Sequence, residues 1–162
     1  MIKFIVDQNA GRLVWWLRMM GYDSAFFTGI DDAAMVRQAL AEDRVLLTRD
    51  SGIIKRRAVS SGRLRAVLFH GDKPEQQIRQ LLAEFDLTAP ARPFTLCLEC
   101  NEPLVRRSRE EVTGRVPPYV FATQTQYTEC PACRRVYWRG THWQAMKKRL
   151  EELTGETLIS RI

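Results

Sequence analysis

Apolar residues recur in two alternating patterns along the first 88 residues. Short apolar runs predict buried strands at residues 2–6, 24–28, 45–48 and 66–69. Between and after these runs, apolar residues at helical spacing predict helices at residues 11–20, 32–42, 53–60 and 74–85. Gly21 follows the first helix and Pro74 opens the last, which suits a helix end and a helix start. Four such units predict an α/β fold, in which helices cover both faces of a parallel sheet and every crossover is right-handed.

The pattern changes after residue 88. Residues 88–94 contain two prolines and show no periodicity, and we place a linker at residues 89–94. Beyond it, the compositions of residues 115–122, 127–129 and 135–138 favour short strands, and residues 143–153 have the spacing of a closing helix. We therefore predict one unit at residues 1–88, a small second unit at residues 95–146, and a helix with a tail at residues 147–162.

The cysteines form two pairs with identical spacing, Cys97 with Cys100 and Cys130 with Cys133. Each pair can form a tight turn that directs two sulfur atoms to one point, and two such turns complete a tetrahedral site. Zinc prefers thiolate ligands and imposes no geometry of its own, so we expect a zinc ribbon. Four protein ligands leave no open position for a substrate, which makes the metal structural. The alternatives are redox pairs or disulfides, although a redox pair normally opens a helix in a thioredoxin-like unit.

Composition and charge narrow the choice of partner. The chain has 162 residues, 45% of them hydrophobic, but no apolar run approaches the ~18 residues that span a membrane. The net charge is +6, and the surplus is larger after residue 88, with 12 Lys and Arg against 8 Asp and Glu. A basic chain favours an anionic partner such as RNA or DNA. Because the metal site uses every cysteine, we expect a cytoplasmic protein without disulfides. The oligomeric state stays open, a homo-oligomer included.

Acidic residues follow the predicted strands. Asp7 ends the first strand, Asp50 follows the third, Asp72 follows the fourth, and Asp32 begins the helix after the second. Because ligands of open parallel sheets bind at the carboxyl ends of the strands, these side chains are expected at one edge. Crowded carboxylates repel one another, and Mg²⁺ or Mn²⁺ relieves the repulsion. Each aspartate is also a favoured helix N-cap, so capping is the alternative, and Asp31 is as good a candidate as Asp32.

A combination of motifs resembles a known family. The first half contains VD at residues 6–7, GRL at 11–13, WLR at 16–18, GYD at 21–23, DD at 31–32 and VLLTRD at 45–50. The second half contains CLECN at residues 97–101, RVPPYV at 115–120, CPAC at 130–133 and YWRGTHW at 137–143. Together, over about residues 2–146, they resemble the Mut-seven C-terminal ribonuclease family, a branch of the PIN-like nucleases.

The resemblance implies a three-layer α/β/α PIN-like domain, a C-terminal zinc ribbon and metal-dependent cleavage of RNA. By motif, the acids carried over are Asp7, Asp32 and Asp50, with Asp72 where a fourth can lie. The chain departs from the family at Gln8, where an acidic residue or Met is frequent, and at residues 33 and 34, both alanine, where acidic residues are frequent.

Basic and aromatic side chains accompany both predicted sites. Aromatic rings stack on unpaired bases and arginines hold phosphates, which suits single-stranded RNA. The alternative is that these residues form a solvated surface or cover the zinc site. The candidates for substrate binding are Arg12, Arg49, Lys55 and Arg56 in the first unit, and Arg139, His142 and Trp143 in the second.

Together these observations lead to one hypothesis. We expect a metal-dependent endoribonuclease in which Asp7, Asp32 and Asp50 bind Mg²⁺ or Mn²⁺ and the ribbon recruits RNA. The alternatives are a non-catalytic RNA-binding module and a toxin-like PIN nuclease controlled by a partner protein. A phospho-accepting receiver domain is disfavoured, because it needs paired acids after the first strand and a lysine after a fifth. The natural RNA, the polarity of cleavage and the number of metal ions stay open.

Overall fold

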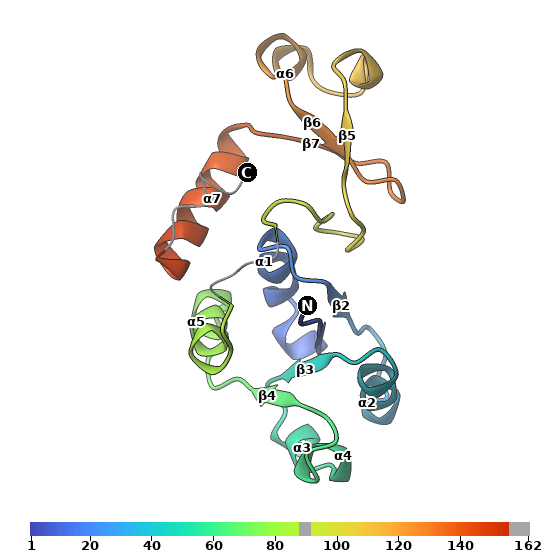
Figure 1. Ribbon diagram of the computed structural model, residues 1–162, viewed down its shortest axis with the longest axis vertical. Helices are drawn as coiled ribbons and strands as arrows, with labels where there is room; N and C mark the ends of the chain where they lie inside the picture. Colours follow the sequence, from blue (N-terminus) through green and yellow to red (C-terminus); the bar gives the residue numbers. More distant parts are fainter. Residues whose placement is uncertain (88–91, 156–162) are drawn as a thin grey trace.

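A computed structural model describes residues 1–87 and 92–155 (Figure 1). Its first sheet is parallel and has the strand order β2-β1-β3-β4. Val6 pairs with Phe26 on one side and with Leu47 on the other, so the strands end at nearly the same level. The predicted α/β fold is confirmed. The strands are β1 (Phe4–Val6), β2 (Ser24–Phe26), β3 (Val45–Thr48) and β4 (Ala66–Leu68).

Helices cover both faces of this sheet (Figure 1). Successive strand residues point to opposite faces, so Phe4 and Val6 join one buried cluster and Ile5 joins the other. The first cluster lies under α1 (Leu13–Met19) and α5 (Pro74–Glu84). The second lies under α2 (Asp32–Ala41), α3 (Ser51–Ile54) and α4 (Arg57–Ser60). The result is the expected three-layer arrangement.

Two predicted elements were wrong. The single helix expected at residues 53–60 is divided into α3 and α4, because Arg56 adopts an extended conformation between them. The strand expected at residues 115–122 is largely the helix α6 (Pro118–Thr123). Proline lacks an amide hydrogen for a sheet, but its fixed φ suits the first turn of a helix. The paired prolines at residues 117 and 118 therefore outweigh the β-branched residues around them.

A second, antiparallel sheet of three strands forms the ribbon. The strands predicted at residues 127–129 and 135–138 are confirmed as β6 (Tyr127–Glu129) and β7 (Val136–Trp138). The edge strand β5 (Val105–Arg107) was not predicted, because its two arginines carry no strand signal. The 3-10 turn η2 (Glu110–Val112) and α6 fill the connection between β5 and β6.

The last helix, α7 (Thr141–Thr154), returns from the ribbon to the parallel sheet. It lies beside α5 (Figure 1). Its residue Leu150 is 1% exposed and belongs to the same buried cluster as Phe4 and Leu13. The predicted helix at residues 143–153 is confirmed. The predicted division into units stays a prediction, and residues 88–91 of the linker region and residues 156–162 of the tail lie outside the described residues.

Candidate functional site

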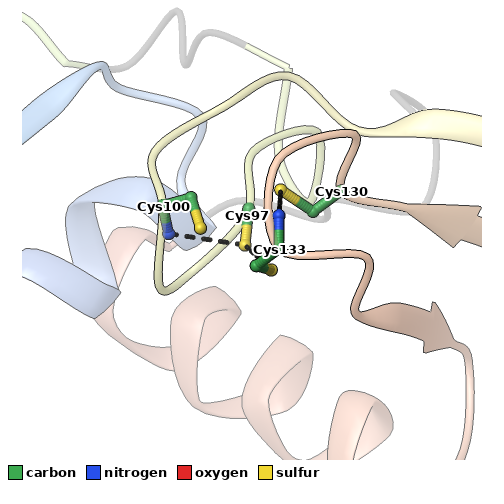
Figure 2. Close-up of side chains that lie close together, drawn as sticks. All are labelled: Cys97, Cys100, Cys130 and Cys133. Carbon is green, nitrogen blue, oxygen red and sulfur yellow. Dashed lines mark hydrogen bonds between the residues drawn. The ribbon is translucent and has the colours of Figure 1, made fainter.

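The four cysteines come together between the two knuckle loops, as Figure 2 shows. One ligand atom from each lies within 4.8 Å of all the others. The Sγ atoms of Cys97 and Cys133 are 3.8 Å apart. Zinc–sulfur bonds of about 2.3 Å in a tetrahedron place two sulfurs about 3.8 Å apart, so the spacing fits zinc. The cluster is therefore able to hold a structural zinc ion.

Two similar turns build this cluster. In the first knuckle, residues 97–101, the amide of Cys100 donates to Cys97 Sγ over 3.4 Å, and Asn101 has a φ of 66°. In the second knuckle, residues 130–134, the amide of Cys133 donates to Cys130 Sγ over 3.5 Å, and Arg134 also has a φ of 66°. A left-handed residue after each pair reverses the chain, which lets one backbone shape occur twice.

Polar contacts prepare Cys97 to act as a thiolate ligand. Burial alone raises its pKa, but hydrogen bonds from the Tyr137 hydroxyl and from the amides of Cys100 and Glu99 lower it to about 7. The Tyr137 oxygen lies 3.2 Å from Cys97 Sγ. By contrast, hydrogen bonding to Cys133 raises the pKa of Cys100 to about 12. Binding of a cation by these cysteines would therefore release protons from the thiols.

A buried carboxylate lies directly before the second knuckle. Glu129 is 1% exposed and forms ion pairs with Arg115 over 2.9 Å, Arg107 over 2.7 Å and Arg134 over 2.8 Å. Hydrogen bonds from Arg115 and Arg107 lower the pKa of Glu129 to about 2. Sequence analysis missed this cluster, because its members come from four separate segments and follow no periodic pattern.

At the parallel sheet, β1 and β3 bring two of the predicted acids into one hydrogen-bonded group. The buried Thr48 hydroxyl donates to Asp7 Oδ2 over 2.8 Å and accepts from the amide of Asp50 over 2.9 Å. Asn9 donates to the same Asp7 oxygen over 3.0 Å, and its Oδ1 accepts from the amide of Arg49 over 2.9 Å. Asp7 and Asp50 thus occupy neighbouring strand ends, as predicted.

Asp31 and Asp32 lie at the start of α2. Asp31 is the N-cap and accepts from the amide of Ala33 over 2.9 Å, as the capping alternative requires. Asp32 lies in the first turn, and Arg56 Nη2 approaches its Oδ2 to 3.9 Å. This contact joins Asp32 to the segment that follows Asp50. Asp50 is itself an N-cap, because its Oδ1 accepts from the amide of Gly52 over 2.7 Å.

The acids nevertheless do not form a closed metal cage. Within residues 1–87 and 92–155, only the cysteine cluster brings three or more ligand side chains within reach of one ion. The topology instead distributes the acids along the carboxyl ends of β2, β1, β3 and β4. We call this row, Asp32, Asp7, Asp50 and Asp72, the acidic edge.

A cavity of about 610 Å³, the edge cavity, adjoins the acidic edge. Its lining includes Asp72 and two of the predicted substrate-binding residues, Arg12 and Arg49. Trp15 and Phe26 also line it, and the sequence analysis did not single out either residue. The sequence held little signal for the exposure of Trp15, because consecutive residues of this helix, such as Leu13 and Val14, are both buried.

A second cavity, the ribbon cavity, has a volume of about 630 Å³ and lies between the ribbon sheet and the start of α7. Arg139 and Trp143, both predicted, line it together with Trp138 and Arg106. Trp143 also packs on Phe94, with ring centroids 4.8 Å apart. Three other candidates, Lys55, Arg56 and His142, are exposed and line neither cavity.

Polar contacts hold the first knuckle against the parallel sheet. Arg18, 5% exposed on α1, donates to the carbonyls of Leu98 over 2.7 Å and Glu99 over 2.9 Å. Asn101 donates to Asp23 Oδ1 over 2.6 Å, and its own Oδ1 accepts from the amide of Ser24. The first knuckle of the cysteine cluster is therefore anchored to α1 and to the start of β2.

Comparison with known proteins agrees with this architecture. The model of the Mut7-C RNAse domain family matches residues 2–150. No curated protein and no solved structure matches the chain significantly. In the described part of the chain, no helix has the length and apolar character needed to cross a membrane. With a match over nearly its whole length, the chain belongs to the Mut7-C RNAse domain family.

Proposed function

We propose that the chain is a metal-dependent endoribonuclease that cleaves RNA at the acidic edge and binds zinc at its four cysteines. The observation that carries the catalytic part is the pairing of Asp7 and Asp50 through Thr48 at adjacent strand ends. The family supports RNA as the substrate. Location at the carboxyl ends of parallel strands supports a ligand site there.

The residues of the acidic edge fit a hard cation. Their donor atoms are carboxylate oxygens, with the Asn9 amide beside them, and Mg²⁺ prefers oxygen ligands. Mg²⁺ is commonly bound by one or two carboxylates together with substrate phosphates, so an open row of acids suits it. We assign Asp7, Asp32 and Asp50 as the residues that hold one or two such ions, with water and substrate phosphates as the remaining ligands, because the three carboxylates are not within reach of a single ion. When bound, Mg²⁺ or Mn²⁺ would make a water more acidic and offset negative charge on the phosphate.

The chain's own residues would position the metal ligands and the RNA substrate. Thr48 and Asn9 hold the Asp7 carboxylate in one orientation, because both donate to the same oxygen. The Asn9 side chain also binds the backbone at Arg49 and so fixes the loop that carries Asp50. Arg12 and Arg49, in the edge cavity, would bind phosphates on either side of the cleaved bond.

The ribbon cavity supports a second contact with RNA. Trp138 and Trp143 offer aromatic surface, and Arg106 and Arg139 offer positive charge within the same groove. This combination suits a single strand with unpaired bases. His142, Lys55 and Arg56 remain proposed RNA contacts on the strength of their exposure alone.

The test is cleavage of a circular single-stranded RNA by Asp50→Asn and by the wild-type protein. A circle has no ends, so its opening shows endonucleolytic cleavage. Asparagine keeps the Oδ1 acceptor for the amide of Gly52 but loses the negative charge, so the fold should survive. We expect cleavage with Mg²⁺ or Mn²⁺ to fall by about 100-fold or more.

The matched control is Asp43→Asn. Asp43 is exposed, precedes β3 at the opposite edge of the sheet, and has a φ of 53° that asparagine tolerates. This variant should cleave like the wild type. Full activity of a pure Asp50→Asn sample would exclude the acidic edge as the catalytic site. RNA binding without cleavage by the wild type, at any metal concentration, would favour the non-catalytic module.

A further inference from the structure

Two aromatic side chains are exposed beside the acidic edge. Trp15 is 51% exposed and Phe26 is 41% exposed, while the adjacent Trp16 packs against the core. Trp15 lies on the outward side of α1, and Phe26 is the last residue of the edge strand β2. Packing of the parallel sheet does not depend on these two side chains, since neither belongs to a buried cluster.

Both rings line the edge cavity. The backbone at Gly11 lies close to the ring of Phe26. A Cβ atom at Gly11 would come within 3.2 Å of two Phe26 ring atoms, so glycine at this position leaves room for the ring. Gly11 precedes Trp15 by four residues, which is about one helical turn. The two rings therefore lie near the start of α1 and line the same cavity.

Two cations line the same cavity without another described partner. Arg12 and Arg49 are exposed, and neither side chain forms a hydrogen bond or ion pair within residues 1–87 and 92–155. Hydrogen bonds link Arg49 to the acidic edge, because its amide donates to the Asn9 side chain and Asn9 donates to Asp7. A ligand in this cavity thus meets aromatic surface, free positive charge, Asp72 of the acidic edge and Asn9, which binds Asp7.

We propose that the edge cavity binds one unpaired nucleobase next to the cleaved bond, stacked on Trp15 and bordered by Phe26. The adjoining phosphates bind Arg12 and Arg49. Every base has a π-face, whereas a base within a duplex has both faces covered, so the slot selects unpaired RNA. This inference rests on the proposed function, since it specifies the substrate of the same site.

The test measures RNA binding without cleavage, so that it does not depend on the catalytic acids. Single-stranded RNA carrying one 2-aminopurine is titrated with protein in buffer free of Mg²⁺ and Mn²⁺, without a chelator that would remove zinc. Stacking on an indole quenches 2-aminopurine, so in an oligomer short enough to bind in a single register, one position along the RNA should be quenched more than the others. Trp15→Ala should remove this quenching and weaken binding by about 10-fold, and Trp15→Phe, which still stacks but has no indole, should retain most of the affinity.

The matched control is Tyr119→Ala, which removes another exposed aromatic ring, 72% exposed, from α6 in the ribbon. It should leave affinity and quenching unchanged. A second measurement uses RNA that lacks the base at the quenched position. Wild-type protein should bind this RNA about 10-fold more weakly, and Trp15→Ala should show no additional loss.

The outcomes separate this inference from the proposed function. If Trp15→Ala binds intact RNA as the wild type does, the base slot is wrong even where Asp50→Asn abolishes cleavage. If Trp15→Ala weakens intact and abasic RNA by the same factor, Trp15 does not contact that base and the inference also fails. If the quenching follows Trp15 but Asp50→Asn cleaves normally, the slot stands and the catalytic assignment fails.

Discussion

The two sheets of the molecule differ in what fills the space beside them. Both faces of the parallel sheet pack against buried aliphatic and aromatic side chains, such as Leu13 and Leu46. The corresponding cluster of the ribbon contains Val112, Val120 and Tyr127. Beside this small cluster lie four cysteines and the buried carboxylate of Glu129 with its three arginines. The parallel sheet therefore relies on hydrophobic burial, whereas the ribbon relies on polar contacts and on four cysteines that are able to hold a metal ion.

Size explains the difference. A short segment buries too little apolar surface to offset the entropy of ordering its chain, so small units need a metal or another cross-link. The ribbon sheet has three strands of three residues each, which is too little to enclose a core of its own. The difference predicts that the two regions respond unequally to the same treatments.

Removal of the proposed zinc should have the largest effect. Structural zinc contributes about 10–16 kcal/mol in small zinc-dependent domains. Chelation, or Cys97→Ser, should therefore remove amide protection from β6 and β7 while β1 and β3 keep theirs. Hydrogen exchange read by mass spectrometry, together with zinc content, checks this. Return of protection to the chelated wild type on adding zinc is the control, and equal loss in both sheets would contradict the comparison.

Replacing Glu129 should have the next largest effect, and it should depend on pH. The pKa of Glu129 lies near 2, below its ordinary value of 4.5. A carboxylate whose pKa is lowered by folding stabilises the fold above the ordinary pKa, and this contribution disappears as the pH falls from about 4.5 to about 2. The difference in unfolding free energy between wild type and Glu129→Gln should therefore be full at neutral pH and shrink over that range.

Release of the proposed zinc in acid would affect the wild type and Glu129→Gln alike, so it largely cancels in the difference between their unfolding free energies. Glu102→Gln is the matched control, because Glu102 is exposed in the ribbon and its side chain has no ion pair among the described residues. It should unfold like the wild type at each pH. A constant difference between wild type and Glu129→Gln down to pH 2 would show that Glu129 is not held ionised by its arginines.

The smallest effect is expected at the contact between the two regions. Arg18→Gln removes charged donors from the carbonyls of Ser24, Leu98 and Glu99, at a cost of about 1–3 kcal/mol. Urea unfolding measures this loss, and hydrogen exchange should show faster opening of the first knuckle. Arg79→Gln, on the exposed side of α5, is the control. Unchanged exchange at residues 98–101 would indicate that the knuckle is held by the metal alone.

Much of the fold followed from local patterns. The four parallel strands and most of their helices were predicted, because burial imposes period 2 on strands and 3.6 on helices. The exceptions lie where backbone chemistry overrides that signal, at the paired prolines of α6 and at extended Arg56. At the candidate site, the strand-end positions of Asp7 and Asp50 were predictable from the same patterns.

By itself the sequence determined the candidate residues for the chemistry: the two cysteine pairs by their spacing, and the aspartates by their places after predicted strands. Only the tertiary structure decided which of them meet. Strand order placed Asp7 beside Asp50, and the path of the chain brought three arginines from separate segments to Glu129 and exposed Trp15 beside the acidic edge. Local periodicity records which face of an element is buried, but contacts between distant segments depend on how whole elements pack.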